Sequence, residues 1–246
     1  MIMNNRSFPV SQIRGRKVIG EEILKEIADR TFYYSGLVSD MSIYEPHLEF
    51  HCLSPTIKHF YENTTEYRLF ASVKWHRWFK PLAMIYRFFS RRILQINLPL
   101  SRKWVEMRGD IFSVKEHMDG RRQPRAWVRK VNEEVCFVAL YSWHKKGERT
   151  YMNIGLPLPF STMTGILELN QYGRSLKLSS RKKRTSKADT GTYLSTKNKQ
   201  FPLPIDEEFF VEQVGAGSLK AQHDMRIFSI PFLTIDYVIR HKALNE

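Results

Sequence analysis

Cysteine is scarce in this sequence, since Cys52 and Cys136 are the only two among 246 residues. Small secreted domains that rely on disulfide bonds generally contain more, and no C-x-x-C pair of the kind that binds zinc is present. We therefore expect two free, buried thiols. The N-terminal residues also lack the continuous apolar core of a signal peptide, and the longest nearly apolar run, residues 81–86, is far shorter than the roughly 20 residues that cross a bilayer. These absences predict a cytoplasmic protein, or one bound peripherally to the inner membrane.

Recognisable catalytic and cofactor motifs are absent as well. The sequence contains no phosphate-binding loop, no dinucleotide-binding glycine pattern, no G-x-S-x-G and no H-E-x-x-H. His47 and His51 are four residues apart, but Pro46 and the residues between them favour a strand. On a strand the two histidines would lie about 13 Å apart, too far to share a metal ion. We predict no cofactor and no metal site, and the sequence does not specify a reaction.

Acidic residues are missing from one long stretch. Between Tyr67 and Val105 there is no Asp or Glu, although the same stretch contains nine Lys or Arg residues and many aromatic ones. The whole chain has 39 basic and 25 acidic residues, a net charge of +14. A segment that is both cationic and aromatic favours an anionic, partly apolar partner, such as a membrane surface or single-stranded nucleic acid. The residues expected to make this contact are Lys74, Trp75, Arg77, Trp78, Phe79, Lys80, Arg87, Arg91 and Arg92.

This basic-aromatic segment is open to three interpretations. A helix over residues 81–92 would place four apolar residues on one face, namely Leu82, Ile85, Tyr86 and Phe89. The basic residues Lys80, Arg87 and Arg91 would lie elsewhere. The helix could lie on a membrane with its apolar face inward. It could form a lid over the opening of a curved sheet, or it could be an ordinary core helix with basic residues toward solvent.

The rest of the chain predicts an α+β fold that is rich in strands. Helices are expected near residues 20–33, 54–63 and 81–92, mainly in the N-terminal third, with Ser54 as N-cap and Pro55 at the first helical position of the second. From residue 120 onward, short segments rich in β-branched and aromatic residues alternate with turn signals. They predict an antiparallel, mostly meandering sheet that curves into a barrel or a sandwich and buries Trp127 and Phe137. Residues 1–19 are expected to be irregular and residues 20–246 to form one domain.

Several patterns follow one another in a characteristic order in the second half. They are Trp127-x-Arg129, Gly165-x-x-Glu168, the FPLP sequence of residues 201–204, Glu212, and the segment 231–237 that ends in Tyr237. In this order and spacing the chain resembles a bacterial family known as domain of unknown function 4166, over about residues 40–243. The resemblance implies that these segments belong to one unit. It carries no activity.

Four of these residues form the candidate ligand-binding site: Arg129, Glu168, Glu212 and Tyr237. If their strands are neighbours, a guanidinium, carboxylates and a phenol could line one pocket and recognise the polar head of an apolar ligand. The alternative is a structural network in which Arg129 pairs with Glu168 or Glu212 within ion-pair reach, because buried charges are usually paired.

The leading hypothesis for function is a binding domain without enzymatic activity. It would hold an apolar or lipid-like small molecule, near an anionic membrane surface. The alternatives are a nucleic-acid binder that uses the basic-aromatic segment and an enzyme with a dispersed Glu/Arg site. A cavity in the sheet would favour the first, a continuous basic groove the second, and an open cluster of Arg129 and Glu168 the third.

Overall fold

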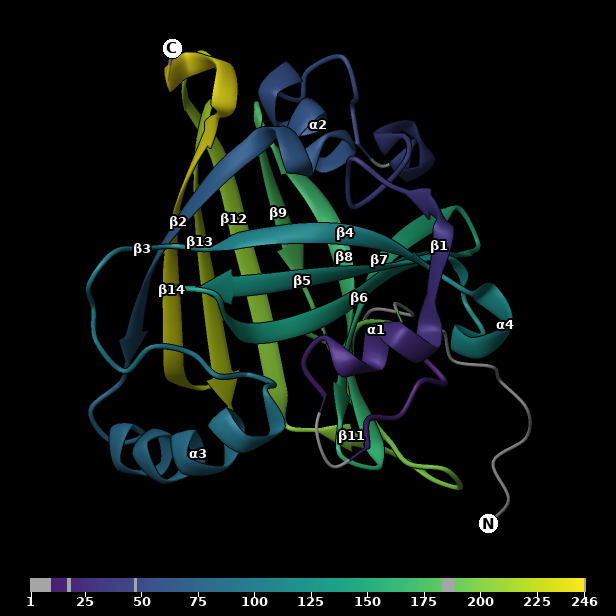
Figure 1. The fold of residues 1–246 in the computed structure, drawn as a ribbon. Coiled ribbons are helices and arrows are strands. Elements are labelled where there is room, and N and C mark those ends of the chain that lie inside the picture. The colour runs from purple at the N-terminus through teal and green to yellow at the C-terminus, as the bar shows by residue number, and fades with distance from the viewer. Residues whose placement is uncertain (1–9, 17–18, 47, 183–188, 246) are drawn as a thin grey trace.

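The segments of the second half that alternate with turn signals form strands, as the sequence predicts (Figure 1). The structure is a computed structural model, and it describes residues 10–16, 19–46, 48–182 and 189–245. His47 and part of the expected irregular N-terminal segment, residues 1–9 and 17–18, lie outside the described residues. The helices are α1 (Glu22–Ile27), α2 (Pro55–Glu62), α3 (Lys80–Ile93) and α4 (Glu116–Asp119). The short 3-10 turns are η1 (Met41–Tyr44), η2 (Thr64–Glu66) and η3 (Lys242–Asn245).

Strands make up most of the regular structure. The first seven are β1 (Ala28–Tyr33), β2 (Tyr67–Trp75), β3 (Val105–Glu106), β4 (Arg108–Val114), β5 (Arg122–Val131), β6 (Glu134–Lys146) and β7 (Arg149–Leu158). The others are β8 (Ser161–Tyr172), β9 (Ser175–Ser179), β10 (Gly191–Ser195), β11 (Gln200–Leu203), β12 (Ile205–Gly215), β13 (Ser218–Ile227) and β14 (Ile230–His241).

All these strands belong to one antiparallel sheet in the order β1-β4-β5-β6-β7-β8-β9-β12-β13-β14-β2-β3, with β10 beside β8 and β11 beside β10. Most neighbours in the sheet are also neighbours in the chain, so the predicted meander is found. The sheet bends until β4, β5 and β6 cross over β12, β13 and β14 (Figure 1). It is not closed, because β1 and β3 stand at its two ends.

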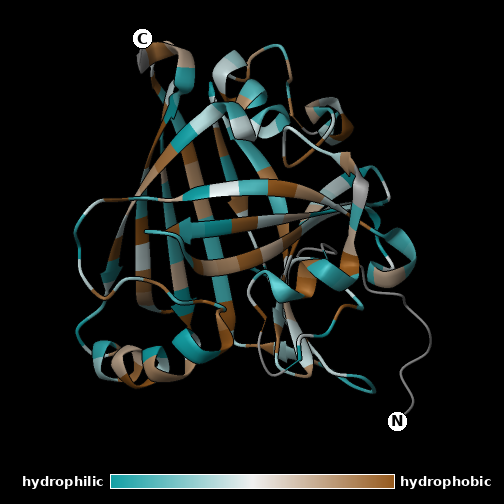
Figure 2. Ribbon diagram, viewed as in Figure 1, coloured by the Kyte–Doolittle hydropathy of each residue, from teal (hydrophilic) through white to brown (hydrophobic). Residues whose placement is uncertain are grey.

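The two faces of the sheet carry separate hydrophobic clusters, because side chains alternate between them along each strand (Figure 2). The concave face holds the larger core, which includes Trp127, Met152, Leu167, Val211 and Ile239. Trp127 is buried, as predicted, and Phe137 is half-buried. On the outer face, β5 and β6 pack against the buried side chains of α1, namely Ile23, Leu24 and Ile27.

The two ends of the curved sheet differ. Helix α2 lies over one end, where its buried residues Ile57, Phe60 and Tyr61 join the main core. Ser54 caps this helix through a hydrogen bond from the Ile57 N–H, with Pro55 at the first helical position, as the sequence predicts. Helix α3 lies at the other end (Figure 1). No described helix is long and apolar enough to cross a membrane.

One expected helix was predicted too long. Helix α1 ends at Ile27, and residues 28–33, which were expected to continue it, form β1 and pair with β4. The residues Thr31, Phe32 and Tyr33 are β-branched or aromatic, which favours a strand wherever a sheet edge is available.

A buried ion pair attaches the N-terminal segment to the outer face of the sheet. Asp119 at the end of α4 pairs with Arg121, and both side chains are almost inaccessible. Asp119 also accepts a hydrogen bond from the Ser11 hydroxyl at 2.7 Å, and Arg121 donates to the Leu140 carbonyl at 3.1 Å. The pair therefore has the additional hydrogen bonds that buried charges require.

We predict that Asp119→Ala lowers the free energy of unfolding by roughly 3 to 5 kcal/mol, because it leaves the Arg121 charge buried and unpaired. Urea denaturation measures this loss. The matched control is Glu22→Ala, which breaks the exposed Glu22–Lys25 pair and should leave stability nearly unchanged. Equal stabilities of the two variants would contradict a structural role for Asp119.

Candidate functional site

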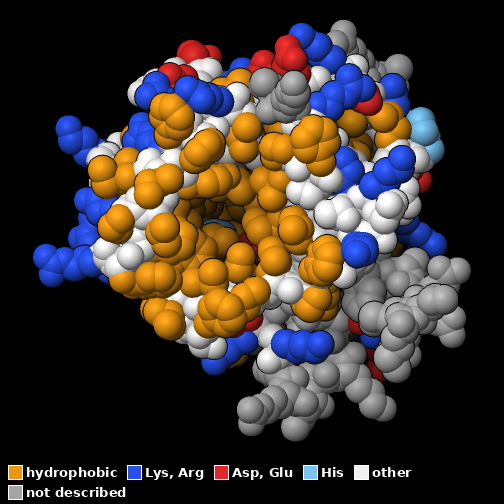
Figure 3. Space-filling model, turned by 90° about the horizontal axis from the view of Figure 1, so that it is seen from below, with side chains coloured by type: hydrophobic (Ala, Val, Ile, Leu, Met, Phe, Trp, Pro, Cys, Tyr) orange, Lys and Arg blue, Asp and Glu red, His pale blue; other side chains and the backbone are white. Residues whose placement is uncertain are grey.

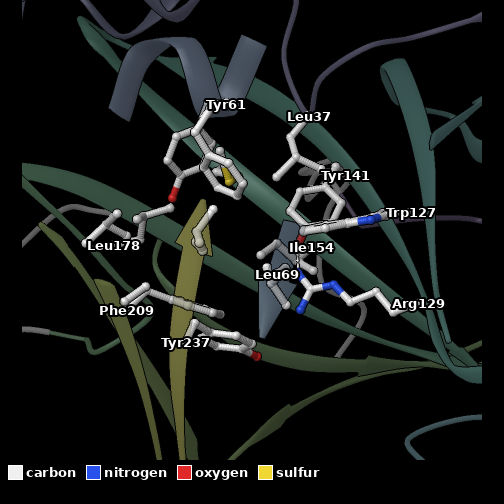
Figure 4. A pocket seen from close by; sticks show the side chains of 15 residues that line it. Leu37, Tyr61, Leu69, Trp127, Arg129, Tyr141, Ile154, Leu178, Phe209 and Tyr237 are labelled. Atoms are coloured by element: carbon white, nitrogen blue, oxygen red, sulfur yellow. Dashed lines mark hydrogen bonds between the residues drawn. The ribbon is translucent and has the colours of Figure 1, made fainter. Parts of the chain in front are cut away.

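A cavity of about 50 Å³ lies on the concave face, beneath α2. It has room for a few water molecules or a small polar group. Its wall is mostly apolar, and its polar groups are the Arg129 guanidinium and the hydroxyls of three tyrosines (Figure 4). The lining residues come from both crossing parts of the sheet and include Leu69, Trp127, Arg129, Tyr141, Ile154, Phe209 and Tyr237, with Tyr61 of α2.

Arg129 lies among aromatic rings. Its guanidinium carbon is 3.6 Å from the ring centre of Trp127, 4.9 Å from that of Phe137 and 5.8 Å from that of Tyr237. The strand residue opposite Arg129 is Gly109. A Cβ atom at Gly109 would come within 2.9 Å of the Trp127 Nε1, so the glycine leaves room for the indole on which Arg129 stacks.

No carboxylate balances the charge of Arg129. Only 7% of the residue is exposed, yet it forms no ion pair with any residue in the described ranges. Its Nη2 makes a long contact of 3.5 Å with the Tyr141 hydroxyl, and the guanidinium also interacts with the Tyr237 hydroxyl. Its Nε has no partner among the described residues. Buried cations are normally paired or fully hydrogen-bonded. The guanidinium of Arg129 therefore has unused capacity to bind an anion.

Arg125, which lies on the same strand and is also buried, shows the contrast. Its guanidinium donates hydrogen bonds to the Gly36 carbonyl and the Ser39 hydroxyl and stacks 3.7 Å from the Tyr34 ring centre. It holds the segment before η1 against the sheet. Burial lowers the pKa of Arg125 to about 10, so it remains charged at neutral pH. Arg125 is satisfied by the protein itself, whereas Arg129 is not.

The phenols next to Arg129 are neutral donors. Burial raises the pKa of Tyr141 and of Tyr237 above that of a free tyrosine, and Arg129 offsets only part of this effect. Both hydroxyls therefore keep their protons over the physiological range. Together with the guanidinium they provide hydrogen-bond donors around the cavity.

A second polar group on the concave face consists of Glu207 and His223. The His223 Nε2 lies 3.4 Å from a carboxylate oxygen of Glu207, and the imidazole stacks on Phe209 at 3.6 Å. Gly165 makes space for this carboxylate, because a Cβ atom there would lie 2.7 Å from Glu207 Oε1. This pair is not among the sites predicted from the sequence. The signal was the alternation of Glu207 with Phe209 and Val211, which places the carboxylate on the core face of β12.

The four residues proposed from the sequence do not form one cluster. Arg129 and Tyr237 lie side by side on the cavity wall. Glu168 faces the other side of the sheet, where it pairs with Arg149. Glu212 is exposed on the outer face of β12, because Val211 beside it points into the core. The predicted ion pair of Arg129 with Glu168 or Glu212 is therefore wrong.

Beyond the cavity, the concave face is incompletely filled. Leu156 and Met225, which do not line the cavity, pack against the main core but remain partly exposed. Viewed from the end near α3, the molecule has a hollow bordered by hydrophobic side chains (Figure 3). An apolar chain could lie along this surface.

The basic-aromatic segment is partly core and partly surface. Trp75 and Phe79 are stacked 5.8 Å apart, and Phe79 packs on Phe232 of the core, so these two are structural. Trp78 is exposed but donates a 2.8 Å hydrogen bond to the Pro231 carbonyl. Of the basic residues, Arg87 is half-buried, and the exposed ones are Lys74, Arg77, Lys80, Arg91 and Arg92.

Two clusters bring three potential metal ligands within 4.8 Å of one another in the described part of the chain. Glu49, His51 and Cys52 form one, in a turn. The other consists of His59, Glu66 and His241. The His241 Nδ1 accepts a hydrogen bond from the Ala243 N–H, so the proton lies on Nε2, the nitrogen that faces Glu66. That nitrogen is not free to bind a metal, and we assign no ion to this cluster.

The two cysteines are free. Cys136 is buried, and burial raises the pKa of its thiol to about 11. Cys52 is only half-buried, so the prediction of two buried thiols is correct for Cys136 alone. Neither lines the cavity.

Comparison with known proteins gives one informative similarity. The chain is 46% identical over 235 residues to a Bacillus subtilis (strain 168) protein called "Uncharacterized membrane protein YndJ". The match covers 94% of this chain but 43% of that protein, so the chain spans less than half the length of this relative. No family model matches the chain, and no solved structure matches it. The resemblance to domain of unknown function 4166 stays a prediction.

We predict that Arg129→Met does not destabilise the protein. The lost cation–π contacts cost roughly 0.5 to 2 kcal/mol. Removing an unpaired buried charge relieves a desolvation penalty of several kcal/mol, and no carboxylate is left without a partner. The free energy of unfolding in urea should therefore stay the same or rise. Arg121→Met is the control, because it leaves the buried Asp119 without its partner and should be clearly destabilising. An equal loss of unfolding free energy in both variants would contradict the unpaired state of Arg129.

Proposed function

We propose that this chain binds an amphiphilic small molecule whose anionic head contacts Arg129 and whose apolar part lies along the concave face. The observation that carries the proposal is the buried, unpaired guanidinium on the wall of a cavity. A buried charge that no protein group balances is costly, and an anionic ligand would supply the missing partner.

The chemistry of the site suits a carboxylate or a phosphate. Guanidinium groups present parallel N–H donors that match the oxygens of either anion. The Arg129 Nε has no hydrogen-bond partner in the described part of the chain, and the neutral Tyr141 and Tyr237 hydroxyls can donate to the same anion. Because the surroundings are apolar, each such hydrogen bond is stronger than it would be in water.

The size and lining of the site separate the head from the tail. The cavity of about 50 Å³ holds a small head but not an acyl chain. The half-exposed Leu156 and Met225 continue the apolar surface outside it. A ligand with its head at Arg129 and its tail toward the hollow would use both regions.

We propose that the ligand comes from a membrane. The chain would then lie at the inner membrane surface as a peripheral domain. The name of the similar Bacillus subtilis protein, which calls it a membrane protein, supports this placement. The cavity supports ligand binding over the two alternatives. An enzyme centred on Arg129 and Glu168 would need both on one face, and Glu168 pairs with Arg149 on the other.

We predict that decanoate binds and that Arg129→Met weakens its binding by roughly 10- to 150-fold, because a hydrogen bond to a charged group contributes about 1.5 to 3 kcal/mol. Decanol, which has the same chain without the charge, should bind parent and variant about equally. Titration calorimetry measures both ligands. Decyl phosphate distinguishes a site for carboxylates from one for phosphates.

Arg240→Met is the matched control. Arg240 is exposed on β14, outside the cavity, so its loss should leave decanoate binding unchanged. Equal affinity of the parent for decanoate and decanol, or equal affinity of the Arg129→Met and Arg240→Met variants for decanoate, would overturn the proposed function.

A further inference from the structure

The end of the molecule opposite α2 consists of turns and connecting segments, together with α3. Helix α2 covers the end at which the turns after β8 and β12 lie, because the Ser54 N–H bonds to the Arg174 carbonyl and its hydroxyl to Gln213. The turns after β7 and β13 therefore lie at the opposite end, with α3. Four hydrogen bonds of 2.8 Å join the segments there: Phe228 N–H to Pro204 O, Trp78 Nε1 to Pro231 O, Ile19 N–H to Ile93 O, and Phe160 N–H to Gly15 O.

This end carries large apolar side chains that are between 52% and 73% exposed. We call them the apolar rim, and they are Leu82, Ile85 and Phe89 of α3, Phe228 and Ile230 of the β13–β14 turn, and Phe160 of the β7–β8 turn. Figure 3 shows this end, with hydrophobic side chains gathered around the hollow of the concave face. Single exposed apolar residues are common on proteins, but a group of this size around one opening marks an interaction surface.

Helix α3 is oriented opposite to an ordinary surface helix. Its buried residues are the small Ala83 and Ser90, whereas Leu82, Ile85 and Phe89 form a stripe toward solvent. Of the three interpretations of this segment, the core helix is therefore not supported by the side chains on this stripe. An apolar stripe that no described residue covers indicates a partner outside the described structure.

Two turns hold a phenylalanine in a backbone conformation that favours glycine or asparagine. Phe160 has a φ of +56° and Phe228 a φ of +50°, and these two are the most exposed residues of the rim. The left-handed conformation is unfavourable for a residue with a side chain of this size, whereas glycine adopts it without this penalty. Strain at an exposed position points to a use for the side chain rather than to packing.

Helix α3 carries charge of one sign. Lys80, Arg87 and Arg91 form a second stripe along α3, and Arg92 stacks on Phe88 at 4.1 Å. The stretch from Tyr67 to Val105, which includes α3, has no acidic residue. Within the described ranges, the one ion pair formed by these cations joins Arg91 to Glu134 at 3.9 Å, and both groups are exposed.

We infer that the apolar rim inserts into the headgroup region of an anionic lipid bilayer, with the opening of the concave face toward the membrane. Cations beside exposed aromatic and aliphatic groups suit phospholipid headgroups above an apolar layer. The rim consists of a helix and two turn tips around an opening, which a fluid interface can accommodate. This inference rests on the proposed function and extends it, because docking would bring the ligand-binding site to the bilayer that supplies the ligand.

The test is co-sedimentation with vesicles of phosphatidylcholine and phosphatidylglycerol in equal parts. The Ile85→Ser/Phe89→Ser variant should bind roughly tenfold or more weakly, because binding scales with the apolar area buried in the interface. The matched control is Tyr172→Ser/Val214→Ser, which removes two exposed apolar side chains at the opposite end and should bind like the parent. Parent binding should also weaken on vesicles of phosphatidylcholine alone, and in about 1 M salt, where the screening length falls to about 3 Å.

Phe228→Asn separates docking from a structural role. Asparagine tolerates the left-handed conformation, so the variant should melt at the same or a higher temperature while its vesicle binding falls. A lower melting temperature with unchanged vesicle binding would show that Phe228 is structural and contradict the inference.

The remaining outcomes distinguish this inference from the proposed function and from other partners. Arg129→Met should bind decanoate weakly but bind vesicles like the parent. This result would support both the proposed function and the docking. Absence of vesicle binding at low salt, or equal binding by the rim and control variants, would overturn the docking. So would displacement from vesicles by a single-stranded oligonucleotide that binds the rim, or a parent dimer that the Ile85→Ser/Phe89→Ser substitutions convert to a monomer in sedimentation equilibrium.

Discussion

The candidate site on the concave face depends on the stack of the Arg129 guanidinium against Trp127. Gly109 leaves space for the indole, the indole supports the guanidinium, and the guanidinium lies between the crossing strands next to Tyr237. An aliphatic residue at position 129 would fill this space without a desolvation penalty, and core positions are usually filled in that way. A cation kept there without a carboxylate is stabilised by ring faces and neutral phenol hydroxyls, which attract charge without neutralising it. The site is therefore electrostatically incomplete in the isolated chain.

The two ends of the curved sheet serve different physical needs. At one end α2 buries Ile57, Phe60 and Tyr61 and closes the core. At the other end the fully buried residues of α3 are Ala83 and Ser90, and Leu82, Ile85 and Phe89 lie outside. A sheet closed by packing at both ends would have no route to Arg129. The asymmetry combines a stable core with an open hollow, and it places the exposed apolar groups where a ligand would enter.

The sheet could be predicted from the sequence because turn signals and β-branched segments recur from residue 120 onward, and the N-cap and proline of α2 are local signals. The face on which each side chain lies could be predicted only where one face of a strand is polar. Strand β8 is buried on both faces from Thr162 to Leu169, so its sequence does not alternate, and Glu168 could not be assigned to the outer side. Residues 28–33 follow a helix without a break and become a strand only through pairing with β4. That contact is nonlocal, and no local pattern contains it.

For the basic-aromatic segment, composition predicts a contact surface but not which of its side chains are exposed. Trp75 and Phe79 belong to the core, whereas Leu82, Ile85 and Phe89 do not, and the two groups are chemically alike in the sequence. What separates them is the small size of Ala83 and Ser90, which lets α3 lie close to the protein on one side and turn its bulk outward. The same reasoning links the rim to Phe160 and Phe228, which lie far from α3 in the chain. Their positive φ angles fix both rings at turn tips, so three separate segments present apolar groups around one opening. That convergence is a property of the fold, and the membrane docking that we propose rests on it.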